Sequence, residues 1–445
     1  MLRFKTLPLS WLCDLLYLLF SPLVVIGWLI LSRFMTRDKC RRGFFQKLGS
    51  VERREGEARS LWVHAVSVGE VLTAAPLVEA LGGAFDGWDV SMSVSTPTGF
   101  DAARKRLPGT KVFYAPFDLS PLVARTFSRR RPDVLVLLEL EVWPNFLLEA
   151  GRRGVPVLIA NGRLSGGSSD RYSRTGFLGR WLFSMVDRVA AQNAAYADRF
   201  KELGVRPGRV EVLGNLKHDR EAGVSAADAA ELRAGLGWSE GELVLVGGCT
   251  HPGEESILLG VLSRLQGEHP GLRLVLAPRH VERLAAEKPA GWIPSNGTER
   301  SFTMWSGWQA GAGEALGDSV LVVDTVGDLE RIYSIADLAV VGGSFVPHGG
   351  HNVLEPASLS RAVLFGPHTA NFEDEVSLLL AGRGGILARD PEELEKALAE
   401  LLGNPEEREK MGQRAGETFS GLSGAVERHV EWIERALSLS KPSAT

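Results

Sequence analysis

The sequence predicts an α/β protein made of two doubly wound domains. Short, continuous apolar runs alternate with helical segments along the chain, and this alternation pauses near residue 214 and restarts near residue 242. Continuous apolar strands separated by helices are typical of a parallel sheet that is covered on both faces. The length of 445 residues fits two or three domains, since a domain has roughly 100–200 residues.

The first domain is predicted to contain six buried strands. They span residues 61–68, 89–96, 111–117, 133–140, 155–161 and 188–193. A helix is expected to open directly after the first strand, at Gly69 and Glu70, and to run through Leu81. Glycine at this position is expected to let the chain turn tightly out of the strand.

The second domain is predicted to repeat the pattern with five strands. They span residues 242–248, 272–278, 319–324, 338–344 and 362–367, and a helix starts near residue 254. The stretch from about 214 to 240 is expected to contain the connection, and a helix over roughly 421–439 can pack on either half. The predicted boundaries are therefore 1–47 for an N-terminal segment, 48–215 and 216–420 for the two domains, and 421–445 for a C-terminal helix and tail.

The N-terminal segment is predicted to be a membrane anchor. Residues Leu15 to Ser32 carry no charge, and this run is close to the length of about 20 residues that spans a bilayer. The basic residues that follow it are Arg33, Arg37, Lys39, Arg41, Arg42 and Lys47. By the positive-inside rule, the rest of the chain stays on the cytoplasmic face. The helix can either span the membrane or lie in its interface, and the basic stretch can attract anionic lipid or serve orientation alone.

Composition excludes several classes of protein. A formal net charge of −4 does not point to nucleic acid, and Cys13, Cys40 and Cys249 are too widely spaced for a disulfide framework or a zinc site. Such cysteine usage favours a reducing compartment. The chain has no GxxxxGK[ST] loop, no GxSxG elbow and no evident DxD metal site. Neither a cofactor nor a metal is therefore expected.

Charged residues at strand ends are the candidate catalytic groups of the first domain. Glu70 can act as a general base toward a hydroxyl, although an acidic residue in a first helical turn also interacts favourably with the helix dipole. Glu139 and Glu141 close an apolar strand and share one face if that strand persists; they form either a site or a structural pair. Lys217 can stabilise a negative leaving group, or it is simply solvated.

Glycine-rich loops are the candidate binding elements of the second domain. The turn in GGCTHPGEE (247–255) can present backbone amides to a phosphate. Arg279 ends the next strand and can grip a phosphate or carboxylate. In GGSFVPHGGHNVLEPA (342–357) the glycines allow close approach of a ligand, Asn352 can cap a helix, and Glu355 can accept bonds from ribose hydroxyls.

Twelve segments, taken in order, resemble the 3-deoxy-D-manno-octulosonic acid (Kdo) transferase family. They are HAVSVGEVLTAAPLV, STPTGF, YAPFD, ELEVWPN, IANGRLS, AAQN, GNLKHD, THPGEE, APRH, DTVGDL, GGSFVPHGGHNVLEPA and FGPHTANF. The resemblance extends from the N-terminal segment to about residue 420. It implies a GT-B fold, in which two Rossmann-like domains face each other across a cleft, with the acceptor on the first domain and CMP on the second.

The resemblance also implies an activity and a set of site residues. The activity is inverting, metal-independent transfer of Kdo from CMP-Kdo to the lipid A precursor lipid IVA, at the cytoplasmic face of the inner membrane. Glu70 is implied as the general base, and Glu139 and Lys217 as transition-state stabilisers. The implied CMP-binding residues are Pro278, Arg279, Val326, Gly327, Asp328, Asn352, Val353, Leu354 and Glu355. Gly162, where the family has alanine, and His348, in a variable stretch, are expected to lie away from the chemistry.

Two other functions are compatible with the same pattern. One is a GT-B transferase or an epimerase that uses a UDP-sugar, because paired doubly wound domains also occur in such enzymes. The other is a non-catalytic, membrane-tethered protein that binds a glycolipid. Binding of CMP rather than UDP distinguishes the first from a Kdo transferase, and a turnover assay distinguishes the second.

Overall fold

The computed structural model describes residues 10, 11, 13–15, 17, 42–219, 223–239, 241–285, 289, 292, 300–311 and 315–439. The chain divides into two compact units. Unit 1 comprises Met1–Asp219 and Gly424–Thr445, and unit 2 comprises Arg220–Ser423. The chain therefore passes from one unit to the other twice. The C-terminal helix, which the sequence allowed on either half, belongs to unit 1.

Unit 1 is built on a seven-stranded, parallel sheet with the order β3-β2-β1-β4-β5-β6-β7. Its strands are β1 (Ser60–Ala65), β2 (Asp89–Val94), β3 (Lys111–Tyr114), β4 (Val134–Leu138), β5 (Val157–Gly162), β6 (Arg188–Ala191) and β7 (Val210–Val212). The doubly wound prediction is confirmed, and all six predicted strands are present. The seventh, β7, was missed because it is a short edge strand whose residues are half-buried or exposed, so that no apolar run marks it.

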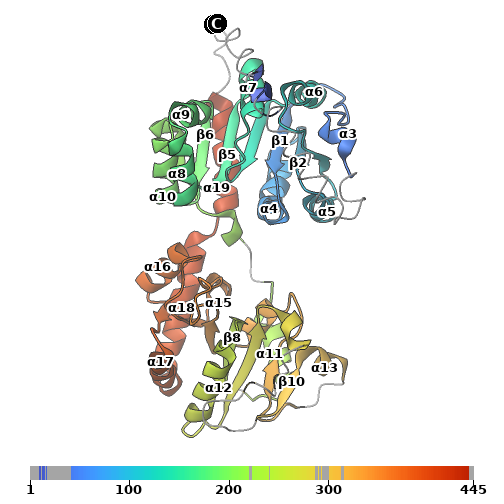
Figure 1. Cartoon of the computed structure of the whole chain (residues 1–445). Helices are drawn as coiled ribbons and strands as arrows, with labels where there is room; N and C mark the ends of the chain where they lie inside the picture. The colour runs from blue at the N-terminus through green and yellow to red at the C-terminus, as the bar shows by residue number, and fades with distance from the viewer. Residues whose placement is uncertain are drawn as a thin grey trace. The chain divides into compact units, whose positions relative to one another are not determined.

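Helices cover both faces of the unit 1 sheet (Figure 1). They are α3 (Phe44–Lys47), α4 (Val68–Ala84), α5 (Pro97–Arg106), α6 (Ser120–Arg130), α7 (Pro144–Arg153), α8 (Gly166–Arg174), α9 (Phe177–Ser184), α10 (Ala194–Glu202) and α19 (Ala425–Leu439), with the 3-10 turns η1 (Pro207–Arg209) and η2 (Leu216–His218). Strand β1 shows why two cores form. Leu61, Val63 and Ala65 pack with α4, α5 and α19, whereas Trp62 points to the other face and packs with α6 and α7.

Unit 2 repeats this architecture, with the strand order β10-β11-β9-β8-β12-β13-β14. Its strands are β8 (Leu243–Thr250), β9 (Leu272–Pro278), β10 (Phe302–Met304), β11 (Val320–Val322), β12 (Leu338–Val341), β13 (Ala362–Phe365) and β14 (Gly385–Leu387). The five predicted strands are confirmed. The two that were missed, β10 and β14, are again three-residue strands at the edges of the sheet.

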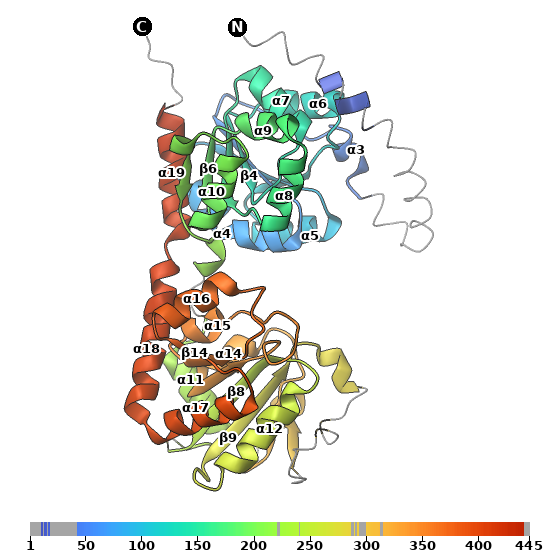
Figure 2. The same cartoon turned by 60° about the vertical axis from the view of Figure 1, so that its left-hand side comes forward.

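The helices of unit 2 are visible in Figure 2. They are α11 (Ala226–Gly235), α12 (Glu254–Leu265), α13 (Trp305–Ala310), α14 (Leu329–Ser334), α15 (Leu354–Ser358), α16 (Glu373–Ala381), α17 (Pro391–Gly403) and α18 (Pro405–Leu422), with the 3-10 turn η3 (Val281–Ala285). One core lies between the sheet and helices α12 and α17, and another lies between the opposite face and helices α11, α13 and α14.

The helix predicted over roughly 421–439 is confirmed as α19, which begins at Ala425. It is separated from α18, which ends at Leu422, by Gly424 at φ 80°. One local prediction is wrong, because no tight turn occurs at Gly69. Helix α4 already begins at Val68, and the Ser67 side chain caps it by accepting a hydrogen bond from the Glu70 backbone amide (3.4 Å).

Most of the predicted anchor lies outside the described residues, as do Arg33, Arg37, Lys39 and Arg41. Within the part of the chain that is described, no helix is both long enough and apolar enough to cross a bilayer. The described residues of this segment contact unit 1. Asp14 accepts a hydrogen bond from the Ser120 amide (2.9 Å), and the Tyr17 hydroxyl donates to Asp118 (2.9 Å).

Candidate active site

In both sheets the order of strands reverses at one point, and ligand-binding loops are expected there. In unit 1, strands β1 and β4 are neighbours, and in unit 2, strands β8 and β12 are neighbours. The chain winds outward in opposite directions from each pair, so the loops that follow the two strands diverge at their carboxyl ends. Such switch points are the usual ligand sites of doubly wound sheets. Glu70, Glu139 and Arg279 follow these strands or a direct neighbour, whereas Lys217 follows the edge strand β7.

Glu70 lies in the first turn of α4, directly after β1. Its carboxylate accepts hydrogen bonds from the Val66 amide (2.7 Å) and from the Ser67 hydroxyl (2.8 Å). These bonds fix the orientation of the side chain, which is half-buried. A carboxylate has about four acceptor positions, so a substrate hydroxyl can still bind there.

Glu139 follows β4 in an unusual backbone conformation. Strand β4 ends at Leu138, and Glu139 has φ 55°, in the left-handed region that non-glycine residues rarely adopt. The expectation that Glu139 and Glu141 share a face of a continuing strand is therefore wrong. Strained backbone of this kind is common at functional sites.

The carboxylates of Glu70, Glu139 and Glu141 lie close enough to influence one another. Burial raises the pKa of Glu139, and the negative charge of Glu70 raises it further. Burial and then the charge of Glu70 raise the pKa of Glu141 to about 7, although the Trp143 indole donates a hydrogen bond to it (2.9 Å). The loop after β4 therefore places two carboxyl groups with raised affinity for protons beside Glu70.

Lys217 completes this cluster. It lies on the turn η2, and its Nζ is 3.8 Å from Oε1 of Glu139. The positive charges of Lys217 and Arg163 both lower the pKa of Glu139 and so partly oppose the effect of burial. The structure thus brings together Glu70, Glu139 and Lys217, which the sequence had placed 147 residues apart at their extremes (217 minus 70).

In unit 2, Glu254 organises the loop that follows β12. Its buried carboxylate accepts hydrogen bonds from the amides of His251 (2.9 Å), Gly343 (2.7 Å), Ser344 (3.1 Å) and Phe345 (2.9 Å). These amides belong to the glycine-rich segments that were expected to cradle a phosphate. Because Glu254 already occupies them, an anion bound to unit 2 must find other donors.

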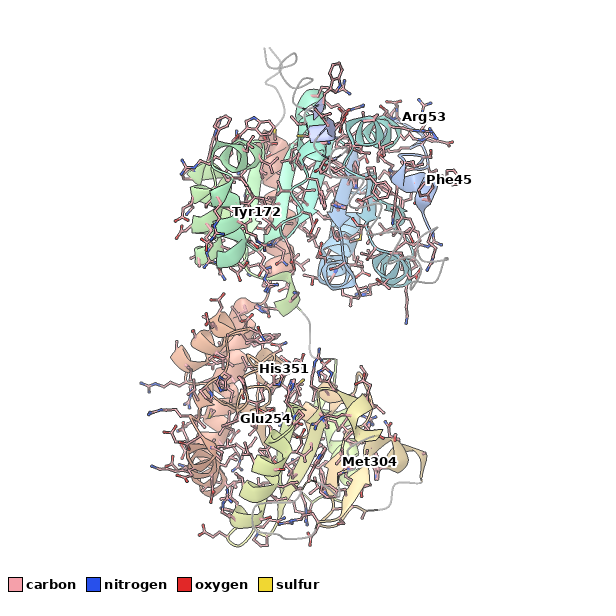
Figure 3. The ribbon with its side chains drawn as sticks, viewed as in Figure 1. Phe45, Arg53, Tyr172, Glu254, Met304 and His351 are labelled. Carbon is pink, nitrogen blue, oxygen red and sulfur yellow. The ribbon has the colours of Figure 1, made fainter. Side chains whose placement is uncertain are left out.

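Histidine and arginine side chains lie beside this loop and can donate hydrogen bonds to an anion. The ring of His251 stacks on that of His348 at 4.1 Å between centroids, lies 5.1 Å from that of His351, and meets that of His280 edge-on at 5.7 Å. The Nε2 atoms of His251 and His351 are 2.8 Å apart, so one of them carries a proton that the other accepts. Figure 3 shows Glu254 and His351 close together in unit 2.

Burial keeps two members of this histidine cluster (His251, His280, His348 and His351), namely His251 and His351, poor in protons. Burial, followed by neighbouring imidazoles and arginines that include Arg279, lowers the pKa of both His251 and His351 to about 4. A bound anion would reverse part of this effect. Among the described residues, no three His, Cys, Asp or Glu side chains are arranged to hold a metal ion.

The predicted CMP-binding residues follow the strands β9, β11 and β12, and Arg279 is the one shown to act on this cluster. Arg279 follows β9, is exposed, and lies within electrostatic reach of His251 and His351. The segment from Val326 to Asp328 follows β11, the next strand outward, and Val326 is 87% exposed. Val353 and Leu354 are buried, so only their backbone can contact a ligand.

The remaining predicted residues make local contacts. The Asn352 side chain accepts a hydrogen bond from the Leu354 amide (3.1 Å) and donates one to Glu355 (3.4 Å). Pro278 is buried at the end of β9. Glycine at position 343 is required by the packing of the protein itself, since a Cβ on Gly343 would lie 2.9 Å from the His351 ring.

Sequence reasoning missed the histidines and Arg163. His348 was expected to lie away from the chemistry, but its ring stacks on His251 beside Arg279. A usable signal was present, because His251 and His280 follow the strands β8 and β9 within two residues, and His348 and His351 lie in the glycine-rich loop after β12. Arg163 was noted only as part of IANGRLS, and its exposed side chain acts on Glu139.

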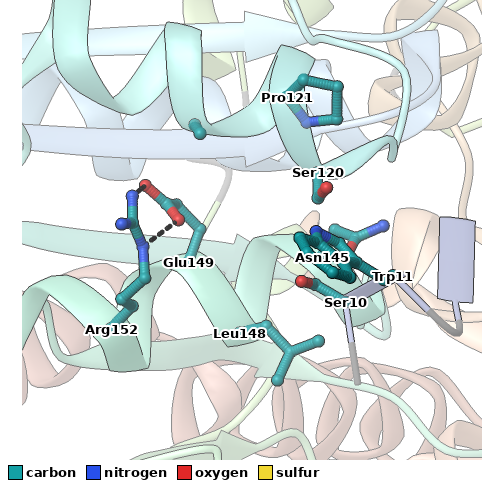
Figure 4. Close-up of a pocket in the computed structure, with 9 residues that line it drawn as sticks. Ser10, Trp11, Ser120, Pro121, Asn145, Leu148, Glu149 and Arg152 are labelled. Atoms are coloured by element: carbon teal, nitrogen blue, oxygen red, sulfur yellow. Dashed lines mark hydrogen bonds and ion pairs between the residues drawn. The ribbon is translucent and has the colours of Figure 1, made fainter. Parts of the chain in front are cut away.

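A separate pocket lies on unit 1, between the N-terminal segment and helices α6 and α7 (Figure 4). Its lining includes Trp11, Ser120 and Asn145, together with Glu149, which pairs in two places with Arg152 (2.6 and 2.7 Å). None of the predicted site residues lines it. We therefore place the chemistry at the strand ends rather than in this pocket.

Comparison with known proteins agrees with the resemblance. A family model described as 3-Deoxy-D-manno-octulosonic-acid transferase (kdotransferase) matches residues 41–220. The 3-deoxy-D-manno-octulosonic acid transferase of Haemophilus influenzae is 30% identical over 439 residues, which cover 94% of this chain and 96% of that protein. The protein of the same name from Bordetella pertussis is 32% identical over 393 residues, covering 85% and 87% of the two chains.

Solved structures share the fold at lower identity. Anabaena HepE in complex with UDP has a TM-score of 0.57 and 15% identity, and the match covers 85% of this chain and 99% of that one. The UDP-GlcNAc 2-epimerase of Neisseria meningitidis has a TM-score of 0.56 and 15% identity, covering 85% and 100%. These likenesses show a GT-B-like arrangement of two doubly wound sheets. The family itself is shown by the two relatives above, which are 30% and 32% identical over most of both chains: the chain belongs to the Kdo transferase family of glycosyltransferases.

Proposed function

We propose that the protein transfers Kdo from CMP-Kdo to a hydroxyl of a lipid A precursor, with inversion at the anomeric carbon. The observation that carries the proposal is the division of charge between the two switch points. Unit 1 gathers three carboxylates with Lys217 and Arg163 beside them, and unit 2 gathers imidazoles and guanidinium groups. The family relatives named as Kdo transferases support the assignment.

In unit 1, Glu70 acts as the general base. Its carboxylate takes the proton of the acceptor hydroxyl, whose oxygen forms a bond to the anomeric carbon of Kdo. The bond from that carbon to the phosphate oxygen of CMP breaks, and CMP leaves with the electron pair. Glu139, 19% exposed and paired with Lys217, supplies negative charge near a transition state of oxocarbenium character, and Lys217 stabilises the leaving phosphate.

In unit 2, the exposed guanidinium of Arg279 and the histidine cluster bind the anionic donor. CMP-Kdo carries a phosphate and a carboxylate, and charge-assisted bonds from guanidinium and imidazole groups suit both. Since Glu254 occupies the nearby backbone amides, the side chains must provide most of this binding.

We further propose that unit 1 binds the cytoplasmic face of the inner membrane through its N-terminal segment. Phe45 on α3 is 75% exposed and lies at the outer surface of unit 1 (Figure 3), close in sequence to Lys47. Exposed aromatic residues next to basic ones are typical of interfacial segments. One residue of the basic stretch forms an ion pair within unit 1, because Arg42 donates two hydrogen bonds to Asp101 (2.6 and 2.7 Å).

Mass spectrometry of the lipid product tests the reaction. The full chain is incubated with a tetra-acylated lipid A precursor and CMP-Kdo, which is generated in place. A mass gain of one or more Kdo units is expected, whereas UDP-sugars in place of CMP-Kdo should give none. Transfer from a UDP-sugar, or no transfer from intact CMP-Kdo, would contradict the proposal.

Flotation with vesicles tests the membrane assignment separately. The full chain should float with vesicles that contain anionic lipid, and Phe45→Ser should weaken this binding. Leu378→Ser on α16 is the matched control, since Leu378 is also exposed (42%) but belongs to unit 2. Equal loss in both variants would contradict a role for α3.

A further inference from the structure

The η2 turn, which carries Lys217, is held in place by a hydrogen bond from its backbone to a buried side chain. The backbone amide of Leu216 donates a hydrogen bond to Oδ1 of Asn161 (3.0 Å), and both residues are buried. Lys217 itself donates its amide to Asn215 (3.1 Å). Lysine has a long, flexible side chain, and that of Lys217 is 48% exposed. The position of its Nζ therefore depends on where the η2 backbone is held.

Asn161 uses its backbone as well as its side chain. It lies in β5 with φ 54°, a conformation that asparagine tolerates better than most residues. Its carbonyl accepts a hydrogen bond from Gln192 (3.0 Å), and its amide donates one to Nε2 of His429 (3.1 Å). A single residue thus joins β5, the segment after β6, the Lys217 turn and the C-terminal helix α19.

His429 can accept this bond in one tautomer alone. Its Nδ1 is 2.6 Å from the Ala425 carbonyl, which can only accept, so Nδ1 carries the proton and Nε2 is free to accept. This arrangement requires a neutral ring. Burial lowers the pKa of His429 to about 4, so the ring is neutral near pH 7.

A second connection joins α19 to the same turn. Asp219, two residues after Lys217, accepts hydrogen bonds from the amides of Ala425 (2.9 Å) and Val426 at the start of α19. The chain leaves unit 1 after Asp219 and returns to it at Gly424. Both passages of the chain are therefore tied together next to Lys217.

We propose that Asn161 and His429 are positioning residues for the transfer reaction, which hold the η2 turn so that the ammonium of Lys217 stays beside Glu139. The inference rests on the proposed role of Lys217. Neither residue reaches substrate, because both are fully buried. They act by fixing the backbone, and the C-terminal helix takes part in the active site through His429.

Substitutions that remove one contact at a time test this inference. Asn161→Gly keeps the backbone conformation accessible but removes the bond to Leu216. It should lower kcat by about 10- to 100-fold, the size expected for a misplaced catalytic group, with an unchanged KM for CMP-Kdo. His429→Leu should lower kcat similarly, and His429→Gln, whose Oε1 can accept the Asn161 amide, should restore most of it. Full-length protein, the mass-spectrometric assay and thermal unfolding are used throughout.

A double-variant cycle distinguishes positioning from a general loss of structure. If Asn161 acts through Lys217, then Asn161→Gly should cause little further loss in a Lys217→Met background. Losses that multiply, or an unchanged kcat in both Asn161→Gly and His429→Leu, would overturn the inference. If Asn161→Gly does not fold, the His429→Leu and His429→Gln pair decides the question. Wild-type activity of Lys217→Met would overturn the role of Lys217 and this inference with it, while Kdo transfer by the wild type would still stand.

Discussion

Units 1 and 2 share one architecture, but they carry opposite chemistry at their switch points. In unit 1 the loops after β1 and β4 present Glu70, Glu139 and Glu141, whereas in unit 2 the loops after β8, β9 and β12 present His251 and the other histidines of the cluster. The backbone alone therefore does not decide the function of a switch point. The side chains that follow the strands do, and here they suit proton removal in one unit and anion binding in the other.

Replacing Glu70 should have the largest effect. Glu70→Gln can still accept the bond from the Val66 amide and can donate from its NH2 group to the Ser67 hydroxyl, but it cannot take up a proton. We expect kcat to fall by about 10³- to 10⁴-fold, the upper part of the range for general acid–base catalysis. Glu79→Gln on the same helix is the control, since Glu79 is 45% exposed and pairs with Arg106 on the surface. Full activity of Glu70→Gln in the transfer assay would move the role of base to another carboxylate, such as Glu141.

Removing Lys217 should affect turnover rather than donor binding. Lys217→Met is expected to lower kcat by about 10²- to 10³-fold, as for loss of one group that stabilises developing charge. The control is Lys201→Met, because Lys201 pairs with Asp198 on the surface of the same unit (2.8 Å). CMP affinity, measured by calorimetric titration, should stay unchanged. A weaker affinity for CMP with an unchanged kcat would show that Lys217 binds the donor. This result would contradict the proposed division of roles between units 1 and 2.

Acid should destabilise unit 1 through its buried histidines, whether or not CMP is bound. Burial lowers the pKa of His64 from 6.5 to about 4, so the unfolded chain binds the extra proton first, and stability is lost as the pH falls from 6.5 to 4. The loss reaches about 3 kcal/mol, at 1.36 kcal/mol per pKa unit. In denaturant unfolding, the difference in the free energy of unfolding between wild type and His64→Asn should become smaller as the pH falls from 6.5 to 4. CMP should not change this difference. A difference that is flat with pH would contradict this.

Removing Arg279 should have the smallest effect, and it should appear in binding. Arg279→Gln is expected to weaken CMP affinity by about 10- to 100-fold, the value of one or two charge-assisted hydrogen bonds, with little change in kcat at saturating donor. Arg389→Gln is the control, because the Arg389 side chain is 78% exposed in the same unit. Unchanged CMP affinity in Arg279→Gln would show that the anion site lies elsewhere in unit 2.

Most of the fold could be predicted because its central strands are continuous apolar runs. Strands β1, β4 and β8 are buried along nearly their whole length, and their sequences show it directly. The edge strands β7, β10 and β14 are only half-buried or exposed, so hydrophobicity does not mark them.

The positions of Glu70 and Glu139 at strand ends could be predicted, but the histidine cluster and the geometry of the candidate site could not. Strand ends pointed to Glu70 and Glu139, since acidic residues next to an apolar run need partners or water. Neither the left-handed conformation of Glu139 nor the pairing of His251 with His351 could be foreseen. Both depend on contacts between loops far apart in the sequence, which no local pattern records.

The contacts of Asp14 and Tyr17 bear on how the protein can be produced. Asp14 accepts a hydrogen bond from the Asn145 side chain (3.2 Å), and Asp118, whose pKa burial raises to about 6, accepts bonds from Tyr17 and from the first amides of α7. A recombinant version shortened to start near residue 42 would lose these partners directly behind the loop that carries Glu139. A truncation intended to improve solubility should therefore retain the chain from before Asp14, and its yield in detergent should be weighed against its activity.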